Sequence, residues 1–383
     1  MEIRIIENLK NVGCQKKLWF IILGVSRMKK KFINYGLVIL LLVLTFYFIF
    51  KGNNFENIYT YIMNADIKFI IMALSFMFFY KACDAKMIQI TLESISEKIE
   101  FRKALKYAMI GFYYSAITPF ASGGQPAQIY HMTKDQISLA SSSATLIIKF
   151  VFYQSVITVY SAILFLFSHQ LIKNQIDKFI VFIEIGLLIN IIGVIFVFMT
   201  IINGKMVKKI ADKIFNIIYK IKKVKNIDKR KKQLEDHIEE YNESLKQIGG
   251  NKKLIVQLTL LTFIQLNLFF SVSYLVYRAL GLTGNSLLEF ISVQALLTMA
   301  VSFIPSPGAL GASEGGFIAL FRMFFPKGIL STGMVLWRGI TYYIVLLIGA
   351  IIALISQIRN SNKKAFLKPK KFNSSNKNNS IWI

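Results

Sequence analysis

Long apolar runs separated by short polar segments make up most of this chain. A run of about 20 apolar residues is long enough to cross a bilayer as an α-helix. The pattern therefore predicts an all-α polytopic membrane protein with about eight spanning helices. The long runs cover residues 32–50, 143–167, 179–202, 254–280 and 329–358, and shorter ones cover 67–80, 104–118 and 287–304.

Two of the shorter runs end in segments that are rich in glycine and proline. TPFASGGQPAQIY occupies 118–130 and PSPGALGASEGG occupies 305–316. Proline removes a backbone donor and glycine weakens a helix, so regular structure is expected to break in both places. In lipid, a broken backbone persists only where it is buried in protein or lines a wet cavity. We therefore predict two broken or re-entrant segments, and their repetition favours a transporter-like binding site.

The charge pattern predicts an orientation in the membrane. The 383 residues are 55% hydrophobic and 17% charged, with a net charge of +26. Basic clusters beside membrane spans remain in the cytoplasm, where they meet anionic lipid headgroups. We therefore predict a membrane protein with both termini cytoplasmic. The clusters lack a recognisable nucleic-acid fold, so direct binding of nucleic acid is not expected. They lie at 1–31, 81–103, 205–253 and from 359 onwards.

These clusters also divide the chain. We predict a basic segment at 1–31, a membrane domain at 32–358 and a disordered basic tail at 359–383. Isoleucines at helical spacing indicate an amphipathic helical hairpin in a cytoplasmic insert at 204–250. In the polar stretch at 81–89, Asp84 lies three residues from Lys81, a spacing that allows the two to pair on one helix face. We favour the alternative, a helix end that snorkels into the headgroups.

Counting the crossings suggests two related halves. Between successive cytoplasmic clusters, each half contains three clear spans and one broken segment. Three crossings cannot return a chain to the side from which it started. Either each broken segment crosses the membrane an odd number of times, or one apparent span in each half is a re-entrant pair.

The two breaks also carry the candidate chemistry. In the first, Ser122, Gly123 and Gly124 would let a headgroup approach the backbone N–H groups, and Gln125 and Gln128 offer amides. In the second, a carboxylate at membrane depth, Glu314, is a functional-site hypothesis. It suits an ammonium group and could equally pair with Lys149 or Arg338. The alternative is tight helix packing by small residues with one internal ion pair.

Other chemistry finds little support in the sequence. The three histidines, His131, His169 and His237, have no catalytic partners at a suitable spacing. Two cysteines and three histidines cannot supply a zinc cluster, and no glycine loop of the Walker type is present. We therefore predict no catalytic residues, no metal site and no cofactor.

SGGQPAQIY at 122–130 and PSPGALGASEGGF at 305–317 resemble motifs of the lysylphosphatidylglycerol synthase transmembrane-domain family. These flippase-like regions occur in bacterial phosphatidylglycerol lysyltransferases and in stand-alone proteins, so the resemblance implies a multi-pass protein of the bacterial plasma membrane. The resemblance covers roughly residues 32–358. The motif positions of the family fall on Gly123, Gly124, Gln125, Pro126, Pro305, Pro307, Gly308, Gly311, Glu314 and Arg338.

The resemblance implies a protein that binds a phospholipid and moves it between leaflets. The motif positions given above, together with Ser122, Gln128 and Lys149, would then form the substrate site. Its expected partners are anionic or aminoacylated phospholipids, such as aminoacylated phosphatidylglycerol, and the sequence is compatible with a homo-oligomer. One alternative is a phosphatidylglycerol lysyltransferase that takes lysine from Lys-tRNA. About 25 residues follow the last expected span, too few for the soluble catalytic domain. A membrane scaffold without substrate is a third alternative.

Overall fold

The computed structural model describes residues 55–173, 177–202 and 227–366. Helices are the only regular elements of these ranges, which confirms the all-α prediction. The expected first span at 32–50 and the first part of the insert lie outside the described residues. Three described segments are long and apolar enough to cross a membrane, and two are shorter apolar helices. The first three are Leu139–Phe167, Lys252–Ala279 and Lys327–Ile358; the shorter two are Ile180–Phe196 and Leu287–Val301.

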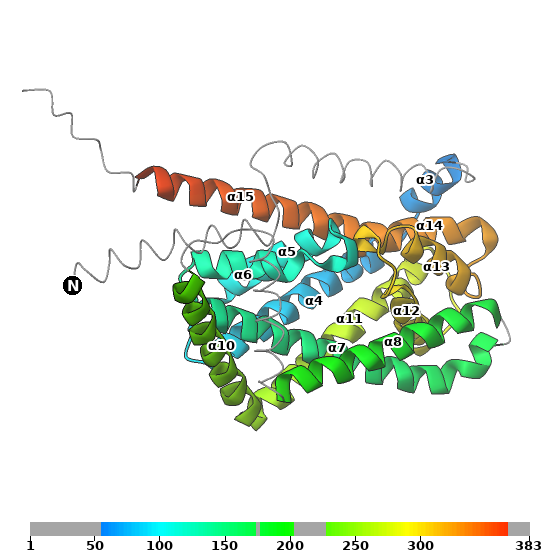
Figure 1. Ribbon diagram of the computed structural model, residues 1–383. Helices are drawn as coiled ribbons and strands as arrows, with labels where there is room; N and C mark the ends of the chain where they lie inside the picture. Colours follow the sequence, from blue (N-terminus) through cyan, green and yellow to red (C-terminus); the bar gives the residue numbers. More distant parts are fainter. Residues whose placement is uncertain (1–54, 174–176, 203–226, 367–383) are drawn as a thin grey trace, which may run out of the picture.

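Six of the helices form the frame of the bundle (Figure 1). Several begin at polar caps that satisfy free backbone N–H groups. The Asp66 carboxylate accepts a hydrogen bond from the Lys68 N–H at 2.9 Å, and the Asn251 side chain accepts one from the Leu254 N–H at 3.0 Å. The six helices are α3 (Phe55–Met63), α4 (Ile67–Glu93), α7 (Leu139–Lys173), α8 (Asp177–Ile202), α10 (Ile227–Gly250) and α11 (Lys252–Ala279).

The first glycine-proline break lies at the tip of a helical hairpin. This element, called hairpin 1, consists of α5 (Phe101–Ala116), the 3-10 turn η1 (Pro119–Ala121) and α6 (Gly124–Lys134). The Gln128 amide near the middle of α6 donates to the Tyr107 carbonyl of α5 at 3.0 Å. Contacts between residues progressively further from the tip show that α5 and α6 are antiparallel.

The second break has the same construction. Hairpin 2 consists of α12 (Leu287–Val301), the 3-10 turn η2 (Pro307–Ala309) and α13 (Ala312–Phe321). Phe290 near the start of α12 stacks on Phe324, just beyond α13, with ring centroids 4.4 Å apart. Each break therefore joins two helices that return to the end of the bundle from which they came, so the structure supports a re-entrant pair in each half.

The two hairpins enter the bundle from opposite ends (Figure 1). The base of hairpin 1 lies at the end that carries α10, and hairpin 2 lies toward the end that carries α3. Their tips, η1 and η2, contact each other between the two ends of the bundle. Two broken helical elements that meet in this way are typical of transporter folds built from inverted repeats.

The last span passes beside both tips. It consists of α14 (Lys327–Arg338), a π-helical turn η3 (Gly339–Tyr343) and α15 (Ile344–Phe366). Single π turns inside α-helices are frequent at functional sites. The helix continues to Phe366, so the beginning of the expected disordered tail is helical.

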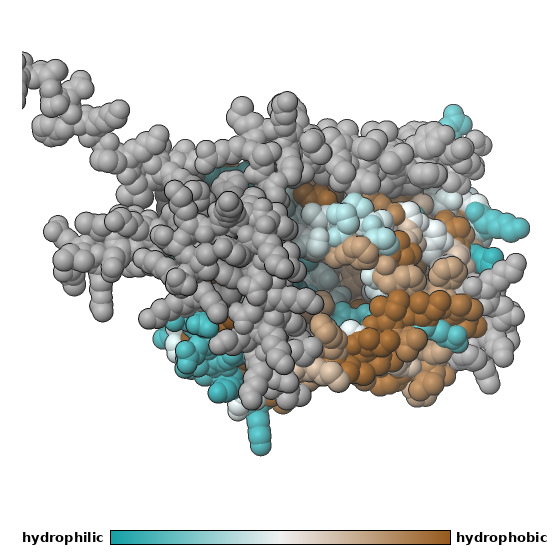
Figure 2. All heavy atoms as spheres, viewed as in Figure 1, coloured by the Kyte–Doolittle hydropathy of each residue, from teal (hydrophilic) through white to brown (hydrophobic). Residues whose placement is uncertain are grey.

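The apolar side chains fall into an interior and a lipid-like surface. Buried aromatic residues such as Phe290, Phe317 and Trp337 fill the half of the bundle around hairpin 2. Large apolar residues also remain exposed, for example Leu166 at 78% and Phe167 at 84%, as expected where lipid is the solvent. Figure 2 shows apolar residues along this face and a hollow near its middle, where more hydrophilic atoms lie deeper.

The insert contains one described helix that packs onto the bundle. Tyr241, Leu245 and Ile248 of α10 are buried in a second apolar cluster with the ends of α4, α7 and α11. Ser138, at the start of α7, donates a hydrogen bond to the Glu240 carboxylate. The described half of the predicted amphipathic hairpin is therefore a helix that docks through its apolar face.

Candidate functional site

The tips of the two hairpins share one backbone geometry. Thr118 and Ser306 are extended, with φ of −123° and −106°, and a proline follows each. The next residues, Phe120 and Gly308, are both left-handed, with φ of 53° and 59°. In each hairpin this conformation stops the incoming helix and allows the chain to reverse. The equivalence supports two related halves.

An ion pair holds the tip of hairpin 2. The Arg338 Nε lies 2.7 Å from the Glu314 Oε1, and both residues are buried. The Arg338 Nη2 also donates to the Gly308 carbonyl at 2.5 Å. The Glu314 Oε2 accepts a hydrogen bond from the Gly311 N–H at 2.7 Å, which closes the first turn of α13. The partner of Glu314 in this structure is therefore Arg338, one of the two basic residues proposed from the sequence.

Tyr342 connects this ion pair to hairpin 1. Its ring lies 4.3 Å from the Arg338 guanidinium carbon, and its hydroxyl donates to the Ala116 carbonyl at 3.0 Å. A Cβ atom on Gly308 would lie 2.3 Å from the same hydroxyl, so only glycine fits there. Tyr342 was not among the predicted site residues. It lies four residues after Arg338, and this spacing, which places both side chains on one helical face, could have identified it from the sequence.

The tip of hairpin 1 is more open. Phe120 is 65% exposed, and Ser122 and Gln125 are also exposed. The Gly123 N–H donates to the Thr118 hydroxyl at 2.8 Å. The polar groups that this tip presents therefore include a hydroxyl and an amide without the charge found in hairpin 2.

Two predicted residues of the first motif lie within hairpin 1. A Cβ atom on Gly124 would lie 1.9 Å from the Ser115 hydroxyl and 2.7 Å from the Gly111 carbonyl, so the small residue lets α6 pack against α5. Gln128 is buried by its hydrogen bond to the Tyr107 carbonyl. Both residues hold the hairpin together.

The remaining motif residues shape the turns. Pro126 lies in the first turn of α6, where a missing backbone donor is tolerated. Pro305 is exposed beside η2, and Pro307 begins it. Gly311, with φ of 80°, precedes α13 in a conformation that favours glycine. The motif thus encodes two chain reversals as well as the charged residues.

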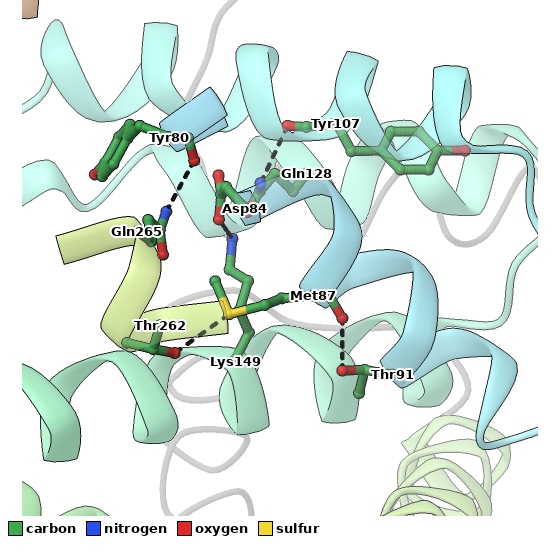
Figure 3. A network of polar contacts seen from close by, with 9 residues as sticks. All are labelled: Tyr80, Asp84, Met87, Thr91, Tyr107, Gln128, Lys149, Thr262 and Gln265. Carbon is green, nitrogen blue, oxygen red and sulfur yellow. Dashed lines mark hydrogen bonds and ion pairs between the residues drawn. The ribbon is translucent and has the colours of Figure 1, made fainter. Parts of the chain in front are cut away.

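Lys149 belongs to a separate polar cluster. Its ammonium group lies 2.7 Å from the Asp84 carboxylate, so it pairs with α4 and does not pair with Glu314 (Figure 3). Beside this pair, the Gln265 amide of α11 donates to the Tyr80 carbonyl at 3.3 Å. The cluster therefore links α4, α7 and α11.

The expectation that the 81–89 stretch snorkels at a helix end is wrong. α4 continues to Glu93, so Lys81 lies near its middle and is 6% exposed. The signal in the sequence was the return of apolar residues after Lys86, at Met87, Ile88, Ile90 and Leu92. The physical reason is the Asp84–Lys149 pair, which compensates a carboxylate inside the bundle.

The site combines two hairpin tips in contact, the buried Glu314–Arg338 ion pair and the neighbouring polar cluster around Asp84 and Lys149. Among the described residues, no group of three histidine, cysteine, aspartate or glutamate side chains is placed to hold a metal ion. The arrangement is suited to binding a polar or charged group within a largely apolar bundle.

Comparison with known proteins gives a consistent result. Residues 33–349 match the family described as the lysylphosphatidylglycerol synthase TM region. A UPF0104 membrane protein from Archaeoglobus fulgidus is 22% identical over 318 residues, which cover 82% of this chain and 94% of that protein. The family match extends over hairpin 1 and hairpin 2.

Proposed function

The chain belongs to the family of lysylphosphatidylglycerol synthase transmembrane regions, and from this premise we propose that it binds a phospholipid at the hairpin tips and moves its headgroup between leaflets. The family supports a role connected with membrane lipids. Aminoacylated phosphatidylglycerol, or another lipid with a linked headgroup, is the substrate we propose.

One observation carries this proposal: two broken hairpins enter from opposite ends and touch at their tips. A headgroup that crosses a bilayer needs polar partners at the depth where the hydrocarbon offers none. Irregular backbone and half-buried side chains at two meeting tips supply such partners. Inverted repeats let one hairpin open toward each leaflet, which is the geometry that alternating access requires.

The two tips have different roles in this proposal. The exposed hydroxyl and amide of hairpin 1, Ser122 and Gln125, meet the headgroup first. The Glu314 carboxylate of hairpin 2 carries the negative charge that suits an ammonium group. As the headgroup crosses, this carboxylate releases Arg338 and binds the ammonium group of the lipid. The acyl chains remain on the apolar outer surface.

Transport is tested in vesicles that contain the purified full chain and a small fraction of lysylphosphatidylglycerol. An impermeant amine reagent reports the fraction of this lipid in the outer leaflet over time. We expect the protein to accelerate equilibration between leaflets. Gln125→Leu removes an exposed amide at the tip and is expected to slow equilibration about tenfold, equivalent to about 1.4 kcal/mol in the barrier.

Gln257→Leu is the matched control, because this exposed glutamine of α11 lies near the α10 end. We expect it to leave the rate unchanged. Equal rates with wild-type protein and with protein-free vesicles would reject transport. Lipid analysis of cells with and without the protein tests the enzymatic alternative: lysylphosphatidylglycerol that appears only with the protein would support a lysyltransferase.

A further inference from the structure

Lys81 lies in the middle of α4 with its ammonium group enclosed by the bundle. The residue is 6% exposed, and its Nζ lies 4.3 Å from the centroid of the Phe112 ring and 4.8 Å from that of Tyr80. In the described part of the chain, no carboxylate lies within ion-pair distance of Lys81 and no group hydrogen-bonds its ammonium. Within the described residues, its ammonium group contacts these two aromatic faces, and the Asp84 carboxylate acts on it from further away.

The neighbouring charges leave Lys81 in excess. Asp84, one turn further along α4, has its carboxylate 2.7 Å from the Lys149 ammonium. The other carboxylate near the tips, Glu314, is bound by Arg338. These groups comprise three cations and two carboxylates, and both carboxylates are already paired. The positive charge of Lys81 therefore has no paired anion among these groups.

The aromatic contacts do not compensate a buried ammonium group. Removing such an ion from water costs more free energy than a cation–π contact returns. An anion at hydrogen-bonding distance would compensate far more of this cost. Lysine binds phosphate well as a compact charge with three donors.

We propose that Lys81 binds the phosphate of a phospholipid headgroup. The inference rests on the proposed function and specifies its substrate class, a lipid with an anionic phosphodiester. Inorganic phosphate presents the same chemistry and is the other source of such a group. Lys81 is then the residue that distinguishes phospholipids from uncharged lipids.

The position of Lys81 connects it to the hairpin tips. The Phe112 ring that covers its ammonium belongs to hairpin 1 and lies 6.3 Å from the Tyr342 ring, which contacts Arg338. The side chains of Asp84 and Lys149 keep 14% and 15% of their surface exposed, so the cluster is open to a ligand. Phe112 therefore lies between Lys81 and the hairpin tips, and in this proposal its ring moves aside when a headgroup reaches Lys81.

A second group in the cluster also lacks a partner. The Gln265 amide nitrogen donates to the Tyr80 carbonyl, but its oxygen is buried without a donor within the described residues (Figure 3). An orphan acceptor of this kind is costly in a dry interior. A hydroxyl or ammonium group of the same headgroup would satisfy it. The cluster thus offers a cation for phosphate and an acceptor for the rest of a headgroup.

The test compares two lipids with identical acyl chains, phosphatidylglycerol and a glycosyl diacylglycerol without phosphate. The full chain is purified in detergent, and its melting temperature and lipid occupancy by native mass spectrometry are measured with each lipid. We expect wild-type protein to prefer phosphatidylglycerol at least tenfold. Lys81→Met should abolish this preference, whereas Lys81→Arg should retain most of it.

Lys98→Met is the matched control, because this lysine is exposed beyond the end of α4. It should keep the wild-type preference. Inorganic phosphate added as a competitor separates the two sources. If inorganic phosphate displaces phosphatidylglycerol from wild-type protein and this displacement depends on Lys81, the site binds phosphate in general. If wild-type protein prefers phosphatidylglycerol and inorganic phosphate does not displace it, the site is specific to the lipid. If Lys81→Met fails to fold, the wild-type comparison decides: equal occupancy by both lipids would overturn the proposal.

These measurements distinguish failure of the Lys81 site from failure of the proposed transport. Unchanged preference in a folded Lys81→Met protein that still equilibrates lipid would overturn the role of Lys81 and leave transport intact. Preference that depends on Lys81 in a protein without transport would reject the proposed function and retain a phospholipid-binding site.

Discussion

Hairpin 1 and hairpin 2 have the same turn geometry but differ in how their tips are held. Arg338 ties hairpin 2 through the Glu314 carboxylate and the Gly308 carbonyl. At the tip of hairpin 1, the side chains of Ser115, Thr118 and Ser122 and the Gly123 N–H form their hydrogen bonds within the hairpin. The comparison indicates that a buried charge anchors hairpin 2, whereas hairpin 1 is joined to the last span through the Tyr342 hydroxyl and leaves an exposed tip that can meet a ligand.

One position shows how a shared backbone acquires two roles. Gly308 leaves room for the Tyr342 ring, whereas Phe120, its equivalent, projects an exposed aromatic side chain from the same left-handed conformation. A bulky residue in this conformation costs about 1–2 kcal/mol. Retaining it at an exposed tip is consistent with a surface that is kept for contact with something other than the protein.

The largest expected effect concerns orientation and is all or none. Lys98→Cys at the base of hairpin 1 and Thr283→Cys at the base of hairpin 2 are made in protein without Cys14 and Cys83. If the repeats are inverted, an impermeant thiol reagent in intact cells should label Thr283→Cys alone. The basic residues around Lys98 predict that its side is cytoplasmic. Labelling of both cysteines from outside would contradict inverted hairpins.

The next largest effect tests the anchor. Either Glu314→Gln or Arg338→Gln leaves the other charge buried and unpaired, and we expect a loss of about 3–5 kcal/mol in stability. The double variant should recover much of this loss because neither charge remains. Melting temperatures in detergent measure all three. A stable Glu314→Gln protein that has lost transport would instead show that the carboxylate serves the headgroup.

The sequence predicted the helices and both breaks because their signals are local. Apolar runs and glycine-proline segments determine where a helix can form, and Glu314 stood out as a carboxylate in an apolar setting. Its pairing with Arg338 was one of three open alternatives, because partners 24 residues apart depend on how the hairpin folds back.

Tertiary packing decided what the sequence could not. Lys81 looked like a snorkelling residue because its burial depends on Phe112 of another helix. Lys149 was expected at the substrate site, but its partner Asp84 lies 65 residues away. Gly124 was expected to admit a headgroup, and the structure shows α5 in that space. Small residues allow another group to approach the backbone closely, but the sequence does not show whether that group is a ligand or a neighbouring helix.

A smaller effect compares the two left-handed positions directly. Gly308→Ala places a methyl group against the Tyr342 hydroxyl and forces alanine into φ of 59°, so we expect a loss of about 2 kcal/mol or more. Phe120→Gly removes strain at φ of 53° and loses little packing, so we expect a gain of about 0.5 kcal/mol. Melting temperatures measure both. A large loss for Phe120→Gly would show that its side chain is part of the folded core.

The smallest effect tests what secures the base of hairpin 1, where its tip is not held. The Asp135 carboxylate, just after α6, accepts hydrogen bonds from the Lys106 ammonium at 2.5 Å and the Tyr107 hydroxyl at 2.6 Å. Burial acts to raise the pKa of Asp135, but these two hydrogen bonds and the positive charges of Lys106 and Lys103 together outweigh it and hold the pKa below its usual value. The charged form is therefore favoured by folding.

The direction of the pH effect follows from this lowered pKa. The stabilisation is complete above the unfolded-state pKa of about 3.9 and is lost as the pH falls through the lower folded-state value. Asp135→Asn keeps an acceptor for Tyr107 but loses the charge, so we expect it to be about 1 kcal/mol less stable at pH 7. Melting temperatures between pH 3 and 7 should show this difference shrinking in acid. Glu93→Gln, at an exposed carboxylate, is the control; a constant difference at every pH would mean that Asp135 acts through shape and not through charge.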